Sequence, residues 1–164
     1  MKIELLQLLK HEGTAVPLRN VEFSPEQLEI DGDDAALAEP VVISGEFTNL
    51  GSGVISFHAE GTYMLKLQCA RCLREFSRRF PCVIQEVFRE PEDWEDFLTD
   101  GMIDVTAIVR HGILLSMEPR YLCREDCKGL CPQCGQDLNQ GPCRCEPETD
   151  PRLSVLKQLL KDDK

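Results

Sequence analysis

Six of the nine cysteines lie in one stretch near the C-terminus, at positions 123, 127, 131, 134, 143 and 145. Within it, Cys131-Pro-Gln-Cys134-Gly135 has the form of a zinc knuckle, in which two thiolates stand three residues apart and glycine follows. Glycine has no Cβ, so the backbone can turn tightly around an ion and direct its amides at the sulfurs. A second pair with the same spacing, Cys69-Ala-Arg-Cys72, stands far upstream. If the two regions share an ion, that ion links distant parts of the chain.

A closed structural zinc site takes four ligands in a tetrahedron, and cysteine thiolates commonly supply them. We interpret Cys82 as a small buried side chain because it lies inside an apolar run, and eight cysteines then remain for two sites. The grouping that we favour joins Cys69, Cys72, Cys123 and Cys127 around one ion and Cys131, Cys134, Cys143 and Cys145 around a second. The second set is local in sequence, so its loop closes easily. The alternative grouping joins Cys69, Cys72, Cys131 and Cys134, as in a zinc ribbon, and leaves four less regular thiols.

Other chemistries of these residues have less support from the sequence. Reduced packing thiols fit poorly with six cysteines within 23 residues. An iron–sulfur cluster would use the same thiolates as zinc. Thioredoxin-like catalysis needs a CxxC pair that opens a helix, whereas Cys69 and Cys72 follow a predicted strand. The three histidines, His11, His58 and His111, do not stand in HxE or HExxH patterns. We therefore expect no hydrolytic zinc site and no enzymatic activity.

The net charge of −11 and the pI near 4.7 argue against a general electrostatic binder of nucleic acid. One region departs from this acidity, because five basic residues surround the first cysteine pair. They are Lys66, Arg71, Arg74, Arg78 and Arg79. Such a cluster on an acidic protein is suited to a focused contact with a phosphate backbone. Salt bridges to the protein's own carboxylates are an equally open interpretation.

The strands and the helix that the sequence predicts around these residues indicate an α+β fold. Residues 41–122 should form a β-rich core with three antiparallel strands, at Val41–Asn49, Val54–Gln68 and Glu75–Arg89. A helix over Ile103–Met117, with Asp104 as its N-cap, carries an apolar stripe that should cover the sheet. The first cysteine pair then lies between two strands, and the cysteine-rich stretch begins after the helix.

The two ends of the chain are less regular. Residues 1–40 contain three prolines and an acidic run, and we expect an arm that packs on the core. Residues 123–164 hold the cysteine-rich segment and a short C-terminal helix that starts at Asp150-Pro151. No signal peptide or transmembrane stretch is evident, which predicts a cytoplasmic protein without membrane contact. In that reducing compartment clustered cysteines indicate metal binding more often than disulfides. The oligomeric state is left open.

Several of these motifs together resemble the YceD family, over about residues 40–160. They are Cys69-Ala-Arg-Cys72-Leu73, Ile103-Asp104, the string from Leu122 to Asn139, Cys143-Arg-Cys145 and Asp150-Pro-Arg-Leu153. Some family members lack the second cysteine cluster but keep the first pair and a His/Cys segment near the position of Cys123–Cys127. That distribution supports the grouping that we favour. The chain departs from the family at Arg110-His111, where acidic residues are frequent, so the resemblance assigns no role to such acids here.

The resemblance implies a non-enzymatic factor in ribosome biogenesis that supports the synthesis, processing or stability of large-subunit rRNA. Its expected partner is this rRNA or its precursor particle, reached directly or through a basic ribosomal protein. The competing hypothesis is an acidic adaptor that binds a basic ribosomal protein and makes no contact with RNA. Direct RNA binding should weaken steeply with salt and depend on the arginines around Cys72, whereas an adaptor should be indifferent to them.

Overall fold

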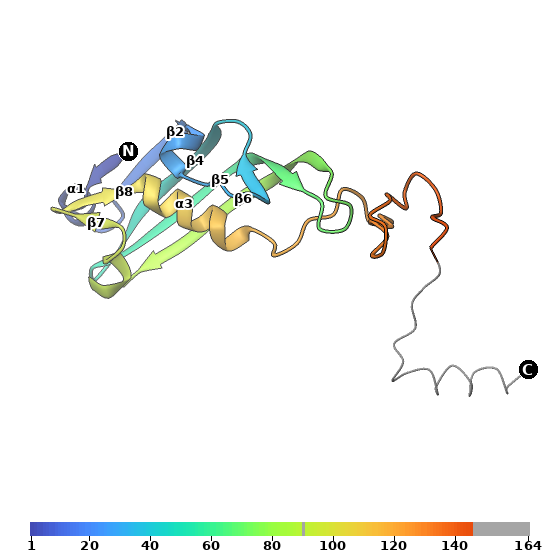
Figure 1. The fold of residues 1–164 in the computed structure, drawn as a ribbon. Helices are drawn as coiled ribbons and strands as arrows, with labels where there is room; N and C mark the ends of the chain where they lie inside the picture. Colours follow the sequence, from blue (N-terminus) through green and yellow to red (C-terminus); the bar gives the residue numbers. More distant parts are fainter. Residues whose placement is uncertain (90, 146–164) are drawn as a thin grey trace, which may run out of the picture.

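The computed structural model describes residues 1–89 and 91–145, and its centre is an antiparallel sheet of five strands (Figure 1). The long strand β5 pairs with β6 along one edge and with β4 and then β3 along the other, while β2 adds to the outer side of β4. The five strands are β2 (Ala15–Phe23), β3 (Ala35–Leu37), β4 (Val41–Gly51), β5 (Val54–Gln68) and β6 (Glu75–Phe88). The expected α+β class is confirmed.

The predicted strands form because apolar residues alternate along them. In β5, Tyr63, Leu65 and Leu67 are buried while the residues between them face outward, as a half-buried strand requires. The connection from β4 to β5 is a tight turn at Ser52 and Gly53, whose φ angles are 52° and 80°. Positive φ at both positions is the geometry that joins twisted antiparallel strands. The two strands therefore pair directly, as Phe47 on Phe57 illustrates with a ring separation of 4.2 Å.

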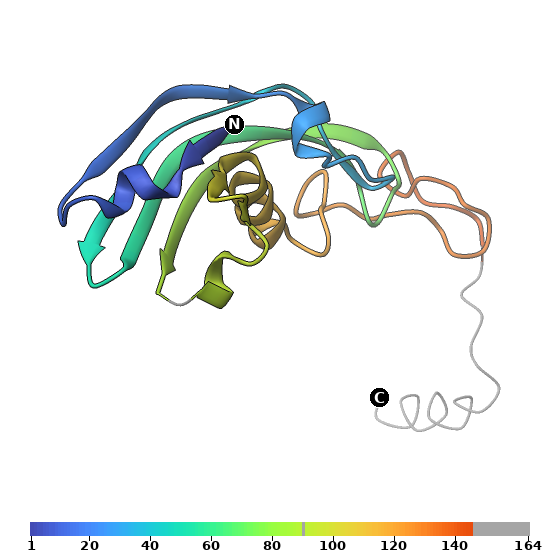
Figure 2. The same ribbon diagram turned by 90° about the vertical axis from the view of Figure 1, so that its left-hand side faces the viewer.

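Helix α3 (Val105–Ser116) covers the inner face of the sheet, which curves around it (Figure 2). Asp104 caps its N-terminus as predicted, accepting hydrogen bonds from the amides of Thr106 and Ala107. The apolar stripe of the helix, with Ile108 and Ile113 at its centre, is buried. A Cβ at Gly112 would lie 2.8 Å from Ile84 of β6, so glycine permits the close approach of helix and strand.

Residues 1–40, for which the sequence predicts an arm packed on the core, contribute strands to both sheets. β2 is a full edge strand on β4, and β1 pairs with β8 in a small second sheet of order β1-β8-β7. Asn49 of β4 is buried and donates from its side-chain amide to the carbonyls of Leu8 and His11, which fixes the N-terminal helix. The remaining elements are β1 (Lys2–Glu4), α1 (Leu5–Leu9), α2 (Pro25–Leu28), a 3-10 helix (Pro91–Trp94), β7 (Leu98–Thr99) and β8 (Met102–Asp104).

The cysteine-rich segment follows α3 and lies beyond the end of the sheet where β5 turns into β6 (Figure 1). It is built from turns, with a single bridge between Leu130 and Asp137. The C-terminal helix predicted from Asp150 lies outside the described residues. Among the residues that are described, no helix has the length and apolar character needed to cross a membrane.

Candidate metal centres

The structure gathers eight cysteine sulfurs into two groups of four, in the grouping that the sequence favoured. Within each group all sulfurs lie within 4.8 Å of one another. The first group is Cys69, Cys72, Cys123 and Cys127, and the second is Cys131, Cys134, Cys143 and Cys145. The zinc-ribbon alternative would need Cys131 and Cys134 beside Cys69, and the structure places them in the other group. Cys82 belongs to neither group and is buried in β6.

The spacing of the sulfurs fits a single tetrahedral ion. Sulfurs at the corners of a tetrahedron, each about 2.3 Å from a central zinc, lie about 3.8 Å apart. The observed Sγ separations are 3.8 Å for Cys69 and Cys127 and 3.8 Å for Cys72 and Cys123. In the second group Cys143 and Cys131 are 3.5 Å apart. A disulfide would bring two sulfurs to about 2.0 Å, and all nine cysteines are free.

The pair Cys69 and Cys72 and the pair Cys131 and Cys134 lie in the same kind of turn. The amide of Leu73 donates to the Cys69 carbonyl and the amide of Gly135 donates to the Cys131 carbonyl, each at 2.9 Å. Leu73 and Gly135 adopt positive φ angles of 59° and 72°. This backbone turns the amides inward toward the sulfurs. Glycine adopts it without strain, whereas leucine does not.

Leu73→Gly should therefore leave the protein as stable as the wild type or stabilise it by up to about 1 kcal/mol. The left-handed region costs an ordinary residue about 1–2 kcal/mol, and the greater freedom of glycine in the unfolded chain offsets part of the gain. The reverse change, Gly135→Leu, should destabilise its own turn. Urea denaturation of both variants checks this. A loss above about 1 kcal/mol for Leu73→Gly would mean that the exposed Leu73 side chain makes a stabilising contact.

In the first group the electrostatics favour an ion at the centre. Burial raises the pKa of Cys69, but hydrogen bonds from the backbone amides of Cys123, Cys72 and Arg71 outweigh it and lower this pKa to about 6. The Arg74 amide lowers the pKa of Cys72, but burial and hydrogen bonds with the neighbouring thiols outweigh it and raise this pKa to about 12. Four thiolates at such short separations repel one another. A divalent cation would allow all four to ionise together.

The second group shows the same contrast with more exposure to solvent. Backbone amides of Cys134 and Gln133, with the Cys143 thiol, lower the pKa of Cys131 to about 6. The hydrogen bond with Cys134, together with burial, raises the pKa of Cys145 to about 12. Cys134 is exposed, whereas three of the four sulfurs of the first group belong to buried residues. The two groups thus share a chemistry and differ in accessibility.

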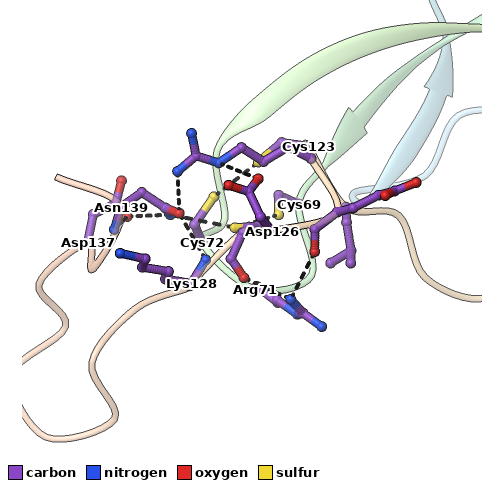
Figure 3. Close-up of polar contacts among 12 residues, drawn as sticks. Cys69, Arg71, Cys72, Cys123, Asp126, Lys128, Asp137 and Asn139 are labelled. Carbon is purple, nitrogen blue, oxygen red and sulfur yellow. Dashed lines mark hydrogen bonds and ion pairs between the residues drawn. The ribbon is translucent and has the colours of Figure 1, made fainter. Parts of the chain in front are cut away.

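The segment that carries Cys123 and Cys127 is held against the β5–β6 turn by hydrogen bonds to its backbone (Figure 3). Arg71 donates to the Cys127 carbonyl at 2.8 Å, and Arg78 donates to the Leu122 carbonyl at 2.8 Å. The Leu130 amide donates to the Arg71 carbonyl at 3.1 Å. Gly129 is needed beside this contact, because its φ is 76° and a Cβ there would lie 2.9 Å from the same carbonyl oxygen. Two distant segments therefore form one site.

The five basic residues singled out in the sequence are all exposed, and each contacts its own protein. Lys66 pairs with Glu75 at 3.1 Å, and Arg79 pairs with Glu39. Arg71 and Arg78 bind backbone carbonyls as described above. The hydrogen bond to the Cys123 sulfur, and the charge of that sulfur, raise the pKa of Arg74. The ion pairs of Lys66 and Arg79 agree with the salt-bridge interpretation that the sequence left open. The contacts of Arg71 and Arg78 were not foreseen, because the carbonyls concerned lie far away in the chain.

The fold and the eight sulfurs define a small α+β protein with two four-cysteine groups beside its sheet. The chain belongs to the YceD family, whose model, described as large ribosomal RNA subunit accumulation protein YceD, matches residues 55–160. This confirms the resemblance drawn from the motifs. The matched span includes every cysteine of both groups.

Individual relatives agree with this assignment. YlbN of Bacillus subtilis, an uncharacterized protein, is 30% identical over 90% of this chain and 92% of its own length. An uncharacterized protein of Mycobacterium tuberculosis is 26% identical over 98% of this chain and 81% of its own. The chloroplastic large ribosomal RNA subunit accumulation protein YCED homolog 1 of Zea mays is 38% identical over 42% of this chain and 25% of its own. No solved structure matches the chain.

Proposed function

We propose that this protein is a non-enzymatic, zinc-binding factor of ribosome biogenesis that acts in the cytoplasm. In this role it supports the synthesis, processing or stability of large-subunit rRNA. The observation that carries the proposal is the family match over residues 55–160, which covers strands β5 and β6, helix α3 and both cysteine groups. Zinc is the proposed ion because it forms closed tetrahedral sites with four thiolates.

The donor sets support a structural rather than a catalytic role for the ions. A catalytic zinc site keeps one position open for water or substrate and usually includes histidine. Here each group supplies four cysteine sulfurs, which fill a tetrahedral ion. Neither group contains a histidine among the described residues. His58 pairs with Glu60 on the surface, and His111 packs against Phe97 at 5.4 Å.

Direct contact with rRNA would use the exposed basic cluster, and Lys66 and Arg79 provide the cleanest test. Each forms an exposed ion pair, and such pairs contribute about 1 kcal/mol or less. By contrast, changes at Arg71, Arg74 or Arg78 would also disturb the first cysteine group. We expect Lys66→Glu with Arg79→Glu to lower association with large-subunit precursor particles on the order of tenfold. Each lost phosphate contact should also reduce the log–log salt slope by about one unit.

Lys10→Glu with Arg19→Glu is the matched control, since it changes the net charge equally at exposed positions at the C-cap of α1 and in β2. Co-sedimentation of each variant with precursor particles at several salt concentrations is the measurement. Equal loss in both double variants would indicate a general charge effect, and no loss in either would remove the phosphate contact from the proposal.

A second candidate is the acidic adaptor for a basic ribosomal protein. It is favoured by the net charge of −11 and by the engagement of the basic cluster with the protein's own groups. For this candidate the Lys66→Glu, Arg79→Glu variant should bind purified large-subunit proteins as well as the wild type does.

A further inference from the structure

The side-chain amide of Asn139 lies beside the first cysteine group (Figure 3). Its Nδ2 donates to the Sγ of Cys127 at 3.5 Å and to Oδ1 of Asp137 at 2.6 Å. Its Oδ1 accepts from Nη2 of Arg124 at 2.7 Å and from the amide of Lys128 at 2.9 Å. Asn139, which lies in the segment between Cys134 and Cys143, thus joins this segment to a sulfur of the first group.

The orientation of this amide follows from its neighbours. The Arg124 guanidinium and the Lys128 amide can only donate, so the Asn139 oxygen must face them. The Asp137 carboxylate accepts from the NH2 group, and the Cys127 sulfur, as a thiolate, also accepts. All four hydrogen-bonding positions of the side chain are therefore used. An amide N–H aimed at a ligand sulfur orients that sulfur and spreads its charge, as partners behind the ligands do in metal sites.

The position of Asn139 in the chain connects it with the second ion. Cys134 and Cys143, both in the second group, flank it in sequence, so an ion bound there closes a loop that contains Asn139. The same loop is anchored on the segment after Cys127, because the Leu138 amide donates to the Gly129 carbonyl at 2.9 Å. Closing a flexible loop restricts its conformations and favours the arrangement in which Asn139 meets Cys127.

We propose that Asn139 couples the two centres: an ion in the second, less buried group holds Asn139 against Cys127 and strengthens ion binding by the first group. This inference rests on the proposed zinc binding. By thermodynamic linkage, an ion in the first group strengthens binding at the second by the same factor. Occupancy of the second centre therefore affects how firmly the first centre keeps its ion, and Asn139 is a positioning residue for both.

A mutant cycle tests the coupling with zinc as the probe. The four proteins are the wild type, Asn139→Ala, Cys134→Ser with Cys143→Ser, and the combination of all three changes. Competition with a chromophoric chelator gives the dissociation constant of the most tightly held ion in each. Asn139→Ala should raise it about 10- to 100-fold. Emptying the second group should raise it to a similar extent, and the combination should add little. Gln136→Ala, an exposed change in the loop between Cys134 and Cys143, is the control and should have no effect.

Two results would overturn the inference. One is wild-type affinity of the first centre when the second group is emptied or Asn139 is replaced. The other is a combined effect equal to the product of the separate effects, which would make them independent. Cadmium-substituted protein gives a second readout, since the resonance of the first centre should shift in Asn139→Asp, which keeps the side-chain size but loses the donor. If the wild type binds no zinc, the proposed metal function fails with it; two independent ions would remove only the coupling.

Discussion

Cys69→Ser is expected to lower the free energy of unfolding by about 4 kcal/mol or more. Structural zinc sites contribute about 10–16 kcal/mol in zinc-finger peptides, and loss of one ligand of four removes much of this. Cys69 is fully buried and its sulfur meets that of Cys127, 58 residues away in sequence. The ion would thus tie the β5–β6 turn to the segment after α3. A loss of this size is comparable to the whole stability of an ordinary domain, about 5–15 kcal/mol.

Trp94 provides the measurement, because it is the only tryptophan and is buried against Phe88 at 3.9 Å. Its fluorescence reports unfolding of the sheet and its cover rather than of the cysteine-rich segment. Urea titration in the presence of zinc should show the large loss for Cys69→Ser. Cys143→Ser is the matched control, since its group is local and lies beyond the sheet. It should shift the Trp94 transition by no more than about 3 kcal/mol, because a 10- to 100-fold loss of affinity in the first group corresponds to about 1.4–2.7 kcal/mol. Equal losses in the two variants would contradict a division into one long-range and one local centre.

Periodicity was enough to predict the core of the fold. The alternation of apolar residues in β5 and β6, the apolar stripe on α3 and the Asp104 cap each depend on residues that are close together in the sequence. Residues 1–40 carry less of this local information. β1 and β3 are three residues long, and their pairing with β8 and β5 depends on partners far along the chain. β2 includes Pro17 and a register shift between Leu18 and Val21, which weaken its alternation.

For the candidate site, too, the sequence predicted one part and not another. Ligand type and spacing predicted which sulfurs meet, because loop closure favours the local set for the second group and leaves the remaining four for the first. The groups around the sulfurs were not predictable. Arg71 and Arg78 bind the backbone carbonyls of Cys127 and Leu122, and carbonyls carry no signature in a sequence. Asn139 had a weak local signal in the Asp-Leu-Asn spacing, since Asp137 accepts from the Asn139 amide two residues later.

The protein isolated without chelators is expected to carry two zinc ions per chain. The eight sulfurs form two groups of four, and each group contains one thiol whose pKa is lowered to about 6. A bound cation would stabilise the thiolate form of the other three. Elemental analysis of the purified protein is the direct measurement. Iron with a visible absorption band would instead indicate iron bound by the same thiolates, and absence of any metal would contradict both groups as metal centres.

A chelator should remove the ion of the second group before that of the first, and each loss should make four thiols reactive. The second group is more exposed, so its ion should leave first, with little change in Trp94 fluorescence. Loss of the ion from the first group should destabilise the sheet, because it frees the segment after α3 from the β5–β6 turn. A thiol reagent should count eight reactive cysteines after full chelation. Burial raises the pKa of the ninth, Cys82, to about 11, so this thiol should react only after denaturation. Simultaneous loss of both ions with complete unfolding would show that the second centre supports the sheet as strongly as the first.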